Sequence, residues 1–177
     1  MILIAIICIS GIQLHCSDPQ YWQYLIQGKV LTSVKQQMTE IKFDSPTRSS
    51  AVFDIDLDGD EDLIVIDDHD IVFVYENVAG GRLAKPPIEI LVGEGAQQIA
   101  YADFDGNGYP DMAIPNQDSD DMAILFNSKG GNFGGLYYLD VGQEPFAILA
   151  ADLNKDKKTD LLVTQLYDNS VNVYSGD

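Results

Sequence analysis

Residues 54–62 read DIDLDGDED, and two later stretches of the chain follow the same pattern. Residues 103–111 read DFDGNGYPD, and residues 152–160 read DLNKDKKTD. The first aspartate of each stretch stands 49 residues before the first aspartate of the next. A fixed period of this length is typical of a repeat protein, in which one supersecondary unit is used several times. The chain is therefore built from one unit used three times.

The similarity between the copies extends beyond the acidic stretch. Val92-Gly93 precedes the second stretch and Val141-Gly142 precedes the third, with Phe43-Asp44 at the same place before the first. A run of apolar residues follows each stretch, at 71–75, 122–126 and 171–174. Short runs of Val, Ile, Leu, Phe and Tyr bounded by Gly, Asp and Asn indicate β-strands separated by turns.

Each copy has room for four strands. In the second copy we expect strands near 98–102, 111–115, 122–127 and 136–141, and no part of the repeat region has a helical period. Four strands in about 50 residues is the size of a β-propeller blade. The sequence therefore predicts an all-β chain with three tandem four-stranded antiparallel blades, at about 41–89, 90–138 and 139–177. We expect the last blade to be truncated at Asp177 before its fourth strand.

Three blades are too few to close a propeller, because known propellers close with four to eight. We therefore expect an incomplete, open propeller. Three explanations fit: the chain is a fragment of a longer product, it takes further blades from other chains or from self-association, or it stays an open arc with exposed edge strands. We favour the first explanation, a fragment.

Side-chain oxygens recur at positions one, three, five and nine of each acidic stretch. Calcium takes six to eight oxygen ligands and accepts carboxylates, Asn side chains and backbone carbonyls. Position seven varies in chemistry, as it can if only its backbone carbonyl is used. The candidate side-chain ligands are Asp54, Asp56, Asp58 and Asp62, then Asp103, Asp105, Asn107 and Asp111, then Asp152, Asn154, Asp156 and Asp160, with the carbonyls of Asp60, Tyr109 and Lys158.

Two other interpretations of these loops were weighed. An EF-hand needs a bidentate Glu at position twelve, where this chain has Val65, Ile114 and Val163. Solvated Asx turns without an ion would explain one isolated loop. Acids at the same places in three copies favour calcium, with up to three ions bound.

The third loop is expected to bind calcium most weakly. Lys155, Lys157 and Lys158 surround its acids. It also lacks the glycine that Gly59 and Gly108 supply at position six, where a sharp turn favours a positive φ.

The charge of the chain limits its partners. The formal net charge is -18 at pH 7, and the residues after Arg48 hold 25 acids against 6 bases. Nucleic acids and anionic membrane surfaces attract basic proteins, so neither is an expected partner. Divalent cations are favoured instead.

The amino-terminal residues resemble an export signal. Residues 1–12 are almost entirely apolar, which is too short for a transmembrane helix. We expect a signal peptide at 1–17, a leader with an odd strand at 18–40, and no membrane insertion after cleavage; the alternative is a buried N-terminal strand. Both cysteines, Cys8 and Cys16, lie in this segment, so calcium rather than a disulfide would stabilise the exported domain.

The acidic loop, the Val-Gly pair before it, the apolar strand after it and the Gly-Asn-Phe turn at 131–133 resemble the FG-GAP/VCBS repeats of integrin-alpha-type β-propellers. The resemblance covers about 41 to the C-terminus. It implies a secreted or cell-surface module that binds calcium and an extracellular protein or carbohydrate, in adhesion rather than catalysis.

Other functional classes were considered. His15 and His69 are the only histidines, and no nucleophile motif, phosphate loop or zinc spacing occurs, so an enzyme is not expected. A structural spacer and a lectin-like fragment of a larger extracellular protein or enzyme remain as alternatives. Tyr137-Tyr138 is the candidate sugar platform for the lectin.

Overall fold

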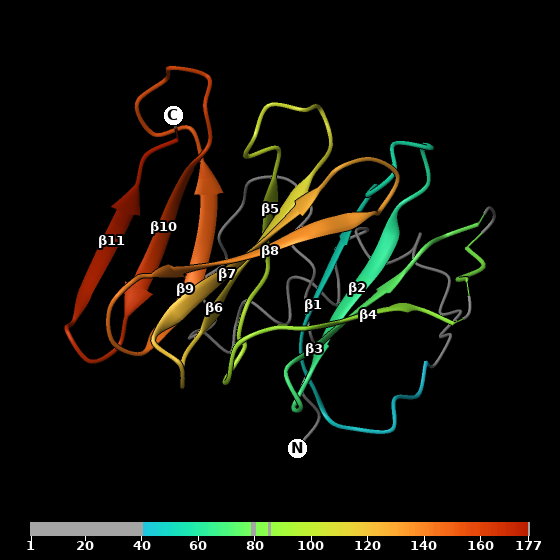
Figure 1. Cartoon of the computed structure of the whole chain (residues 1–177), viewed down its shortest axis with the longest axis horizontal. Helices are drawn as coiled ribbons and strands as arrows, with labels where there is room; N and C mark the ends of the chain where they lie inside the picture. Colours follow the sequence, from blue (N-terminus) through green and yellow to red (C-terminus); the bar gives the residue numbers. More distant parts are fainter. Residues whose placement is uncertain (1–40, 79–80, 85, 177) are drawn as a thin grey trace, which may run out of the picture. The chain divides into compact units, whose positions relative to one another are not determined.

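The computed structural model describes residues 41–78, 81–84 and 86–176. The expected signal peptide at 1–17 and leader at 18–40 lie outside these residues. Residues 43–177 group into one compact unit, and its described part contains eleven β-strands and no helix (Figure 1). Accordingly, no helix in the described ranges is long and apolar enough to cross a membrane.

The strands form three antiparallel sheets in chain order. The first sheet contains β1 (Thr47–Phe53), β2 (Asp62–Asp67), β3 (Ile71–Tyr75) and β4 (Ile88–Leu91). The second contains β5 (Ala100–Ala102), β6 (Asp111–Asn116), β7 (Asp121–Asn127) and β8 (Phe133–Asp140). The third contains β9 (Pro145–Ala151), β10 (Asp160–Gln165) and β11 (Ser170–Tyr174). Neighbouring strands in each sheet are consecutive in the chain, so every sheet is a simple meander.

The all-β prediction is confirmed, and the strands expected in the second copy coincide with β5 to β8. The sheet of the third copy has three described strands, which agrees with the expectation that this copy ends before its fourth strand. None of the three blade-like sheets is closed on itself.

The first apolar core lies between the first and second sheets. Because successive strand residues point to opposite faces, Ile64, Ile66, Val72 and Val74 share one face of the first sheet. Met112, Ile114, Ala123 and Leu125 share the facing side of the second sheet, and all eight side chains are buried in one cluster. The rings of Phe53 and Tyr101 stack across this interface with centroids 4.1 Å apart.

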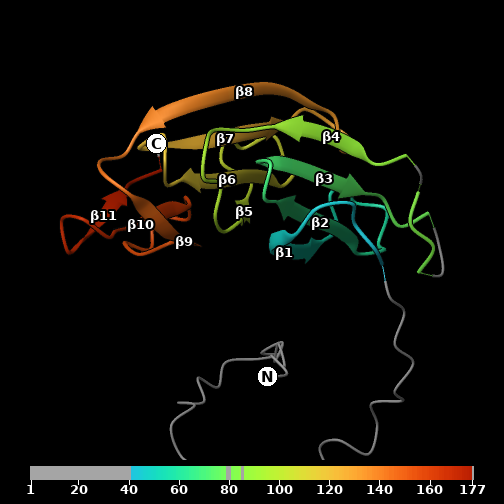
Figure 2. The ribbon, with the colours of Figure 1, turned by 90° about the horizontal axis from the view of Figure 1, so that it is seen from below.

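The second core repeats this arrangement one sheet further along. The opposite face of the second sheet presents Ala100, Ala113 and Met122, and the third sheet packs Ile148, Leu161 and Val163 against it. We call the face that each sheet turns toward the following copy its forward face, and the opposite one its backward face. Figure 2 shows the first strands β1, β5 and β9 on one side of the unit and the last strands β4 and β8 on the other.

Candidate metal sites

The three acidic loops occupy equivalent places, because each connects the first strand of a sheet to the second. They span 54–61, 103–110 and 152–159, and Figure 1 shows them at the same edge of the unit. The residues assigned to positions one to seven lie within the loop, and position nine is the first residue of the strand that follows it. No two loops share a proposed ligand.

The aspartate at position one organises each loop by accepting hydrogen bonds from the loop's own backbone. Asp54 accepts the amide of Asp58 at 3.1 Å on Oδ1 and that of Gly59 at 2.9 Å on Oδ2. Asp103 and Asp152 accept the amides four and five residues ahead in the same way. The chain therefore winds around this carboxylate, which explains why an acid recurs there.

Positions three and five form further Asx turns. Asp56 accepts the amide of Asp58 at 3.1 Å, and Asp58 accepts the amide of Asp60 at 2.9 Å. The same two bonds recur in the second and third loops. Each of these bonds uses Oδ1, and in the first loop no described residue donates to Oδ2 of Asp56 or Asp58. These oxygens are therefore left as acceptors for a cation.

The aspartate at position nine is a buried clamp between two parts of its sheet. Asp62 is 1% exposed, and its carboxylate accepts the amides of Ile55 at 2.7 Å and Asn77 at 2.8 Å. Asp111 and Asp160 make the equivalent pairs of bonds. Position nine thus ties the acidic loop to the chain after the third strand, a role that the sequence analysis did not identify. Each carboxylate oxygen keeps a second lone pair for a metal.

Burial and neighbouring carboxylates both raise the pKa of two of the position-nine aspartates, Asp62 and Asp111. Burial, the largest influence, raises the pKa of Asp62 above its ordinary value, although the amides of Asn77 and Ile55 lower it. The nearby carboxylates Asp56 and Asp54 raise it further. Asp111 has a raised pKa for the same reasons, with Asp105 and Asp103 as its neighbours. A divalent cation in the loop would remove this repulsion, because it adds positive charge among clustered carboxylates.

Two of the three loops bring carboxylates close enough to share one ion. In the first loop, oxygens of Asp54, Asp56 and Asp58 lie within 4.8 Å of one another. In the second, oxygens of Asp103, Asp105 and Asp111 do so. Hard oxygen donors at this separation fit calcium, so the residues present suit the ion that the sequence predicts.

The third loop gathers its three carboxylates less closely than the second loop does. Its position three is Asn154, whose amide donates to Asp156 at 2.8 Å. Among the described residues, no three carboxylates of this loop lie within the separation found in the other two. The third loop therefore keeps the hydrogen bonds of the other loops, but its carboxylates are less closely gathered.

The loops need left-handed backbone at two positions. At position six φ is +97° at Gly59 and +91° at Gly108, values that glycine adopts readily. Lys157 holds φ at +72° in the third loop, and Lys155 holds +66° at position four. A non-glycine residue in this region costs about 1 kcal/mol or more. The third loop therefore has the same geometry with more backbone strain.

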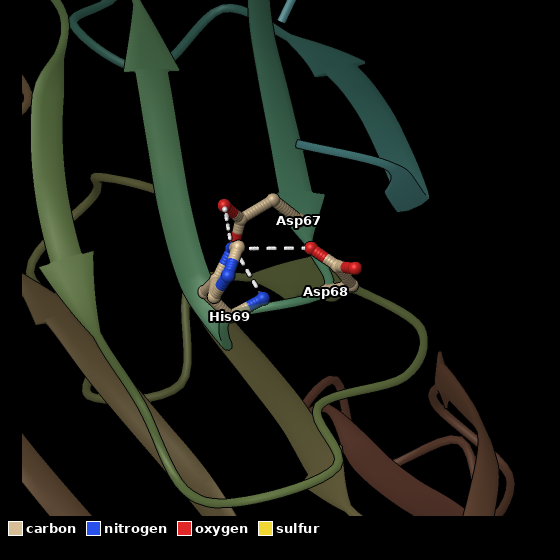
Figure 3. A group of neighbouring side chains, drawn as sticks. All are labelled: Asp67, Asp68 and His69. Atoms are coloured by element: carbon tan, nitrogen blue, oxygen red, sulfur yellow. Dashed lines mark hydrogen bonds and ion pairs between the residues drawn. The ribbon is translucent and has the colours of Figure 1, made fainter. Parts of the chain in front are cut away.

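One further group of possible metal ligands lies at the other end of β2, in the turn before β3 (Figure 3). Asp67 accepts the hydroxyl of Ser45 at 2.6 Å and the amides of His69 and Ile71 at 3.0 and 2.9 Å. His69 Nδ1 lies 3.1 Å from an oxygen of Asp68. Although burial raises the pKa of Asp67, the hydrogen bonds from Ser45, Ile71 and His69 together lower it. Its carboxylate thus closes the turn.

A buried polar residue occurs at the position of Asp67 in all three copies. Asn116 and Gln165 stand 49 and 98 residues after Asp67 and, like it, are at most 2% exposed. This set is not apparent in the sequence because the three residues differ in type. Only their shared spacing could have revealed them.

The fold and the loops together define a repeat protein of blade-like antiparallel sheets, each with an acidic loop after its first strand. Comparison with protein families finds the FG-GAP-like repeat twice, at residues 54–114 and 103–163. Because these matches span more than half of the 177 residues, the chain belongs to the FG-GAP-like repeat family. A search of curated proteins gives no significant match.

Proposed function

We propose that the chain is a non-catalytic, calcium-binding module of propeller type that acts outside the cell in binding or adhesion. The observation that carries the proposal is the thrice-repeated loop in which backbone amides bind the side-chain oxygens at positions one, three, five and nine. The first and second loops support it most strongly, because each places three carboxylates within 4.8 Å. The clustered acids are assigned to metal binding rather than to catalysis.

The ligands come from the loops themselves. In the first loop, Asp54, Asp56 and Asp58 would hold the ion together with Asp62 and the carbonyl of Asp60. The second loop offers the same set with Asn107 and the carbonyl of Tyr109. Calcium supplies positive charge that offsets carboxylate repulsion, and so it stiffens the loop edge of each sheet.

An extracellular location suits such loops. They are largely exposed and carry Asx turns that form without a helix on either side. Extracellular calcium modules bind at roughly 10⁻⁴–10⁻³ M, whereas cytosolic calcium sensors bind at roughly 10⁻⁷–10⁻⁵ M. Sites in the weaker range would be filled only where calcium is abundant.

Thermal unfolding with and without calcium tests the metal assignment. We expect calcium, but not an equal concentration of magnesium, to raise the melting temperature, because magnesium demands octahedral geometry and gives up its waters reluctantly. The variant Asp58→Asn keeps an acceptor for the amide of Asp60 but loses a carboxylate. Calorimetric titration should therefore show calcium affinity at the first site lowered about tenfold. Asp118→Asn, in an exposed turn away from the loops, is the control. An unchanged melting temperature in calcium would sink the assignment.

The ranking of the three sites needs its own titration. We propose that the third site is the weakest, since three lysines crowd the loop and its three carboxylates are not gathered as closely as those of the other two loops. Asp156→Asn should therefore remove the last binding step and leave the tighter steps in place. Three sites of equal affinity in the unmodified chain would contradict the ranking.

A second candidate function is carbohydrate binding, which a cleft between the second and third sheets favours. The cleft has a volume of about 410 Å³ and is lined by Gln117, Asp118, Asp120, Gln143, Glu144 and Tyr167. The Tyr167 ring is 68% exposed and offers a stacking surface beside several hydrogen-bonding groups. Tyr137 and Tyr138, the platform expected from the sequence, are 61% and 52% exposed on β8.

A glycan array can distinguish the two tyrosine surfaces. If the cleft binds sugar, Tyr167→Ala should abolish binding while Tyr137→Ala leaves it unchanged. The reverse result would place the site on β8. No binding to any glycan would leave an extracellular protein as the partner to be sought.

A further inference from the structure

The first and second acidic loops are joined by one asparagine of the second sheet. Asn127 is the last residue of β7 and is fully buried. Its Nδ2 donates to the carbonyl of Ile55, in the first loop, at 2.7 Å. The bond joins residues 72 positions apart in the chain, and it connects the first sheet to the second sheet, which packs on its forward face. The first loop is therefore held by a residue of the next copy.

The same residue is bound to the second loop at three points. The amide of Asn127 donates at 2.8 Å to Asp111, the position-nine aspartate. Its carbonyl accepts the side-chain amide of Asn107, the candidate ligand at position five, at 2.8 Å. Its Nδ2 also donates to the carbonyl of Pro110 at 3.1 Å. The placement of Asn127 therefore depends on the placement of the candidate ligands of the second loop.

In the first loop, the bond reaches a residue that lies among the candidate ligands. Ile55 stands between Asp54 and Asp56, which occupy positions one and three. Its amide donates at 2.7 Å to Asp62, and its side chain is fully buried in the first core. A continuous series of hydrogen bonds thus runs between the position-nine aspartates of the two loops, through Ile55 and Asn127.

The second and third loops lack this link. Gly176 occupies the place of Asn127 in the third copy, because its amide makes the same bond to the position-nine aspartate, at 3.1 Å. Phe104 occupies the place of Ile55 in the second loop for the same reason. Gly176 has no side chain to donate to the Phe104 carbonyl. The backbone bonds of the repeat are therefore alike in the second and third copies, but only the second copy has a side chain that reaches the preceding loop.

Resting on the proposed function, we propose that Asn127 couples the first and second calcium sites, so that filling either one raises the affinity of the other. Filling of the second loop fixes Asp111 and Asn107, and through them the backbone of Asn127. Its side chain then holds Ile55 in place, so the first loop has less conformational freedom left to lose on binding. Linkage requires the reverse effect to be equal in size. The third site has no such residue and fills independently of the second.

Charge alone would give the opposite result. Repulsion between two bound divalent cations lowers the affinity of each loop for its ion. This repulsion acts on both pairs of neighbouring loops, because the three loops occupy equivalent places in their sheets. Positive coupling that is confined to the first pair therefore requires a contact that the second pair lacks.

NMR titration of the full chain with calcium chloride tests the proposal, because it follows each site separately. The amides at position six belong to Gly59, Gly108 and Lys157, and each donates to the position-one aspartate of its own loop. We expect the signals of the first two to change together, over a narrow range of calcium concentration. The signal of Lys157 should change at a higher concentration.

Variants that weaken one site measure its effect on the next. Asp58→Asn weakens the first site, and it should raise the calcium concentration that half-fills the second site at least about fivefold. Asp105→Asn weakens the second site in the same way and should leave the third site unchanged. The two variants remove the same charge from neighbouring loops, so they differ in whether a side chain joins the weakened loop to the one that is measured.

Replacement of Asn127 identifies the residue responsible. Asn127→Ala keeps the backbone bonds to the second loop but loses the bond to Ile55. The first and second sites should then fill independently, while both still bind calcium. Asn77→Ala is the matched control and should keep the coupling, because the Asn77 side chain donates to the Glu61 carbonyl within its own copy. If Asn127→Ala does not fold, the comparison with Asp58→Asn still decides, because that variant leaves Asn127 in place.

The outcomes separate this proposal from the proposed function. If no loop binds calcium, the proposed function fails and the coupling fails with it. If the loops bind calcium but the first and second sites fill independently, only the coupling is overturned. Equal coupling between the second and third sites, or coupling that survives Asn127→Ala in the folded chain, would overturn it too.

Discussion

Single residues at fixed positions of the repeat hold the acidic loops in shape. The buried clamp at position nine is an aspartate in all three copies, and both of its oxygens accept backbone amides. Position one likewise accepts amides from the loop that follows. The same carboxylates that are proposed to bind calcium are therefore needed to form the loop without it.

Asp67 gives a prediction about pH. Its pKa is lowered from 3.8 in the folded protein, so its ionised form contributes stability above the unfolded value. That contribution is lost as the pH falls from about 3.8 toward the lower folded pKa. Asp67→Asn removes the acceptor for the Ser45 hydroxyl and should cost about 1 kcal/mol at pH 7. Urea denaturation with a chelator present measures the free energy of unfolding. The difference in this free energy between Asp67→Asn and the unmodified chain should become smaller near pH 3.

Asp68→Asn is the control for this experiment. The Asp68 side chain is 38% exposed, and its replacement removes the same charge from the same turn without removing the bond to Ser45. A loss of stability in Asp68→Asn equal to that in Asp67→Asn would show that net charge, and not the buried hydrogen bond, is responsible.

At the level of the loop, the third copy carries removable backbone strain. Lys157 holds φ at +72° where the other copies have glycine. Lys157→Gly should therefore stabilise the chain by about 0.5–1 kcal/mol. Lys158→Gly removes an equal charge at a position without positive φ and should stabilise less or destabilise. Melting temperatures in a chelator compare the two variants, and equal effects would attribute the gain to charge alone.

One buried side chain adds a hydrogen bond to the apolar contact between the first and second sheets. Asn127, at the end of β7, is fully buried and donates to the Ile55 carbonyl of the first acidic loop at 2.7 Å and to that of Pro110 at 3.1 Å. Asn77 occupies the equivalent place in the first sheet and donates to the carbonyl of Glu61 within its own copy. Asn127 therefore fastens the first loop to the second sheet.

Replacement of these two asparagines tests that link. Asn127→Ala leaves the buried Ile55 carbonyl without its donor, which should cost about 1–3 kcal/mol. Asn77→Ala should cost less, since Asn77 is half-buried and makes no bond between sheets. Chemical denaturation measures both losses. If Asn77→Ala is as harmful as Asn127→Ala, the bond between sheets does not account for the loss.

The melting temperature of the whole molecule should depend on sodium chloride and calcium, because its negative charges repel one another. Without calcium, raising sodium chloride from about 10 to 150 mM should raise the melting temperature, since salt screens carboxylate repulsion. With three calcium ions the formal charge would fall from -18 to -12, and the salt effect should be smaller. Scanning calorimetry at the two salt concentrations, with and without calcium, measures the difference. A salt effect that calcium does not change would contradict this account.

Much of the fold and of the candidate site could be predicted from local pattern. The 49-residue spacing located the three copies, and alternating apolar runs located β3, β7 and β11 almost residue by residue. The candidate ligands of each loop could be proposed from sequence because they lie within nine residues of one another. The third copy was expected to end before its fourth strand, and its sheet has three described strands.

The sequence by itself determined the repeat, the strands and the acidic loops, because each depends on residues that are close together in the chain. The tertiary structure alone decided which groups are buried. The clamp of Asp62 needs Asn77, fifteen residues away, and Asp67 needs Ser45, twenty-two residues away. Exposure of Leu149 and burial of Ile64 were likewise undecided by sequence, since the two residues are equally apolar. What separates them is whether another sheet packs against the face on which each one lies.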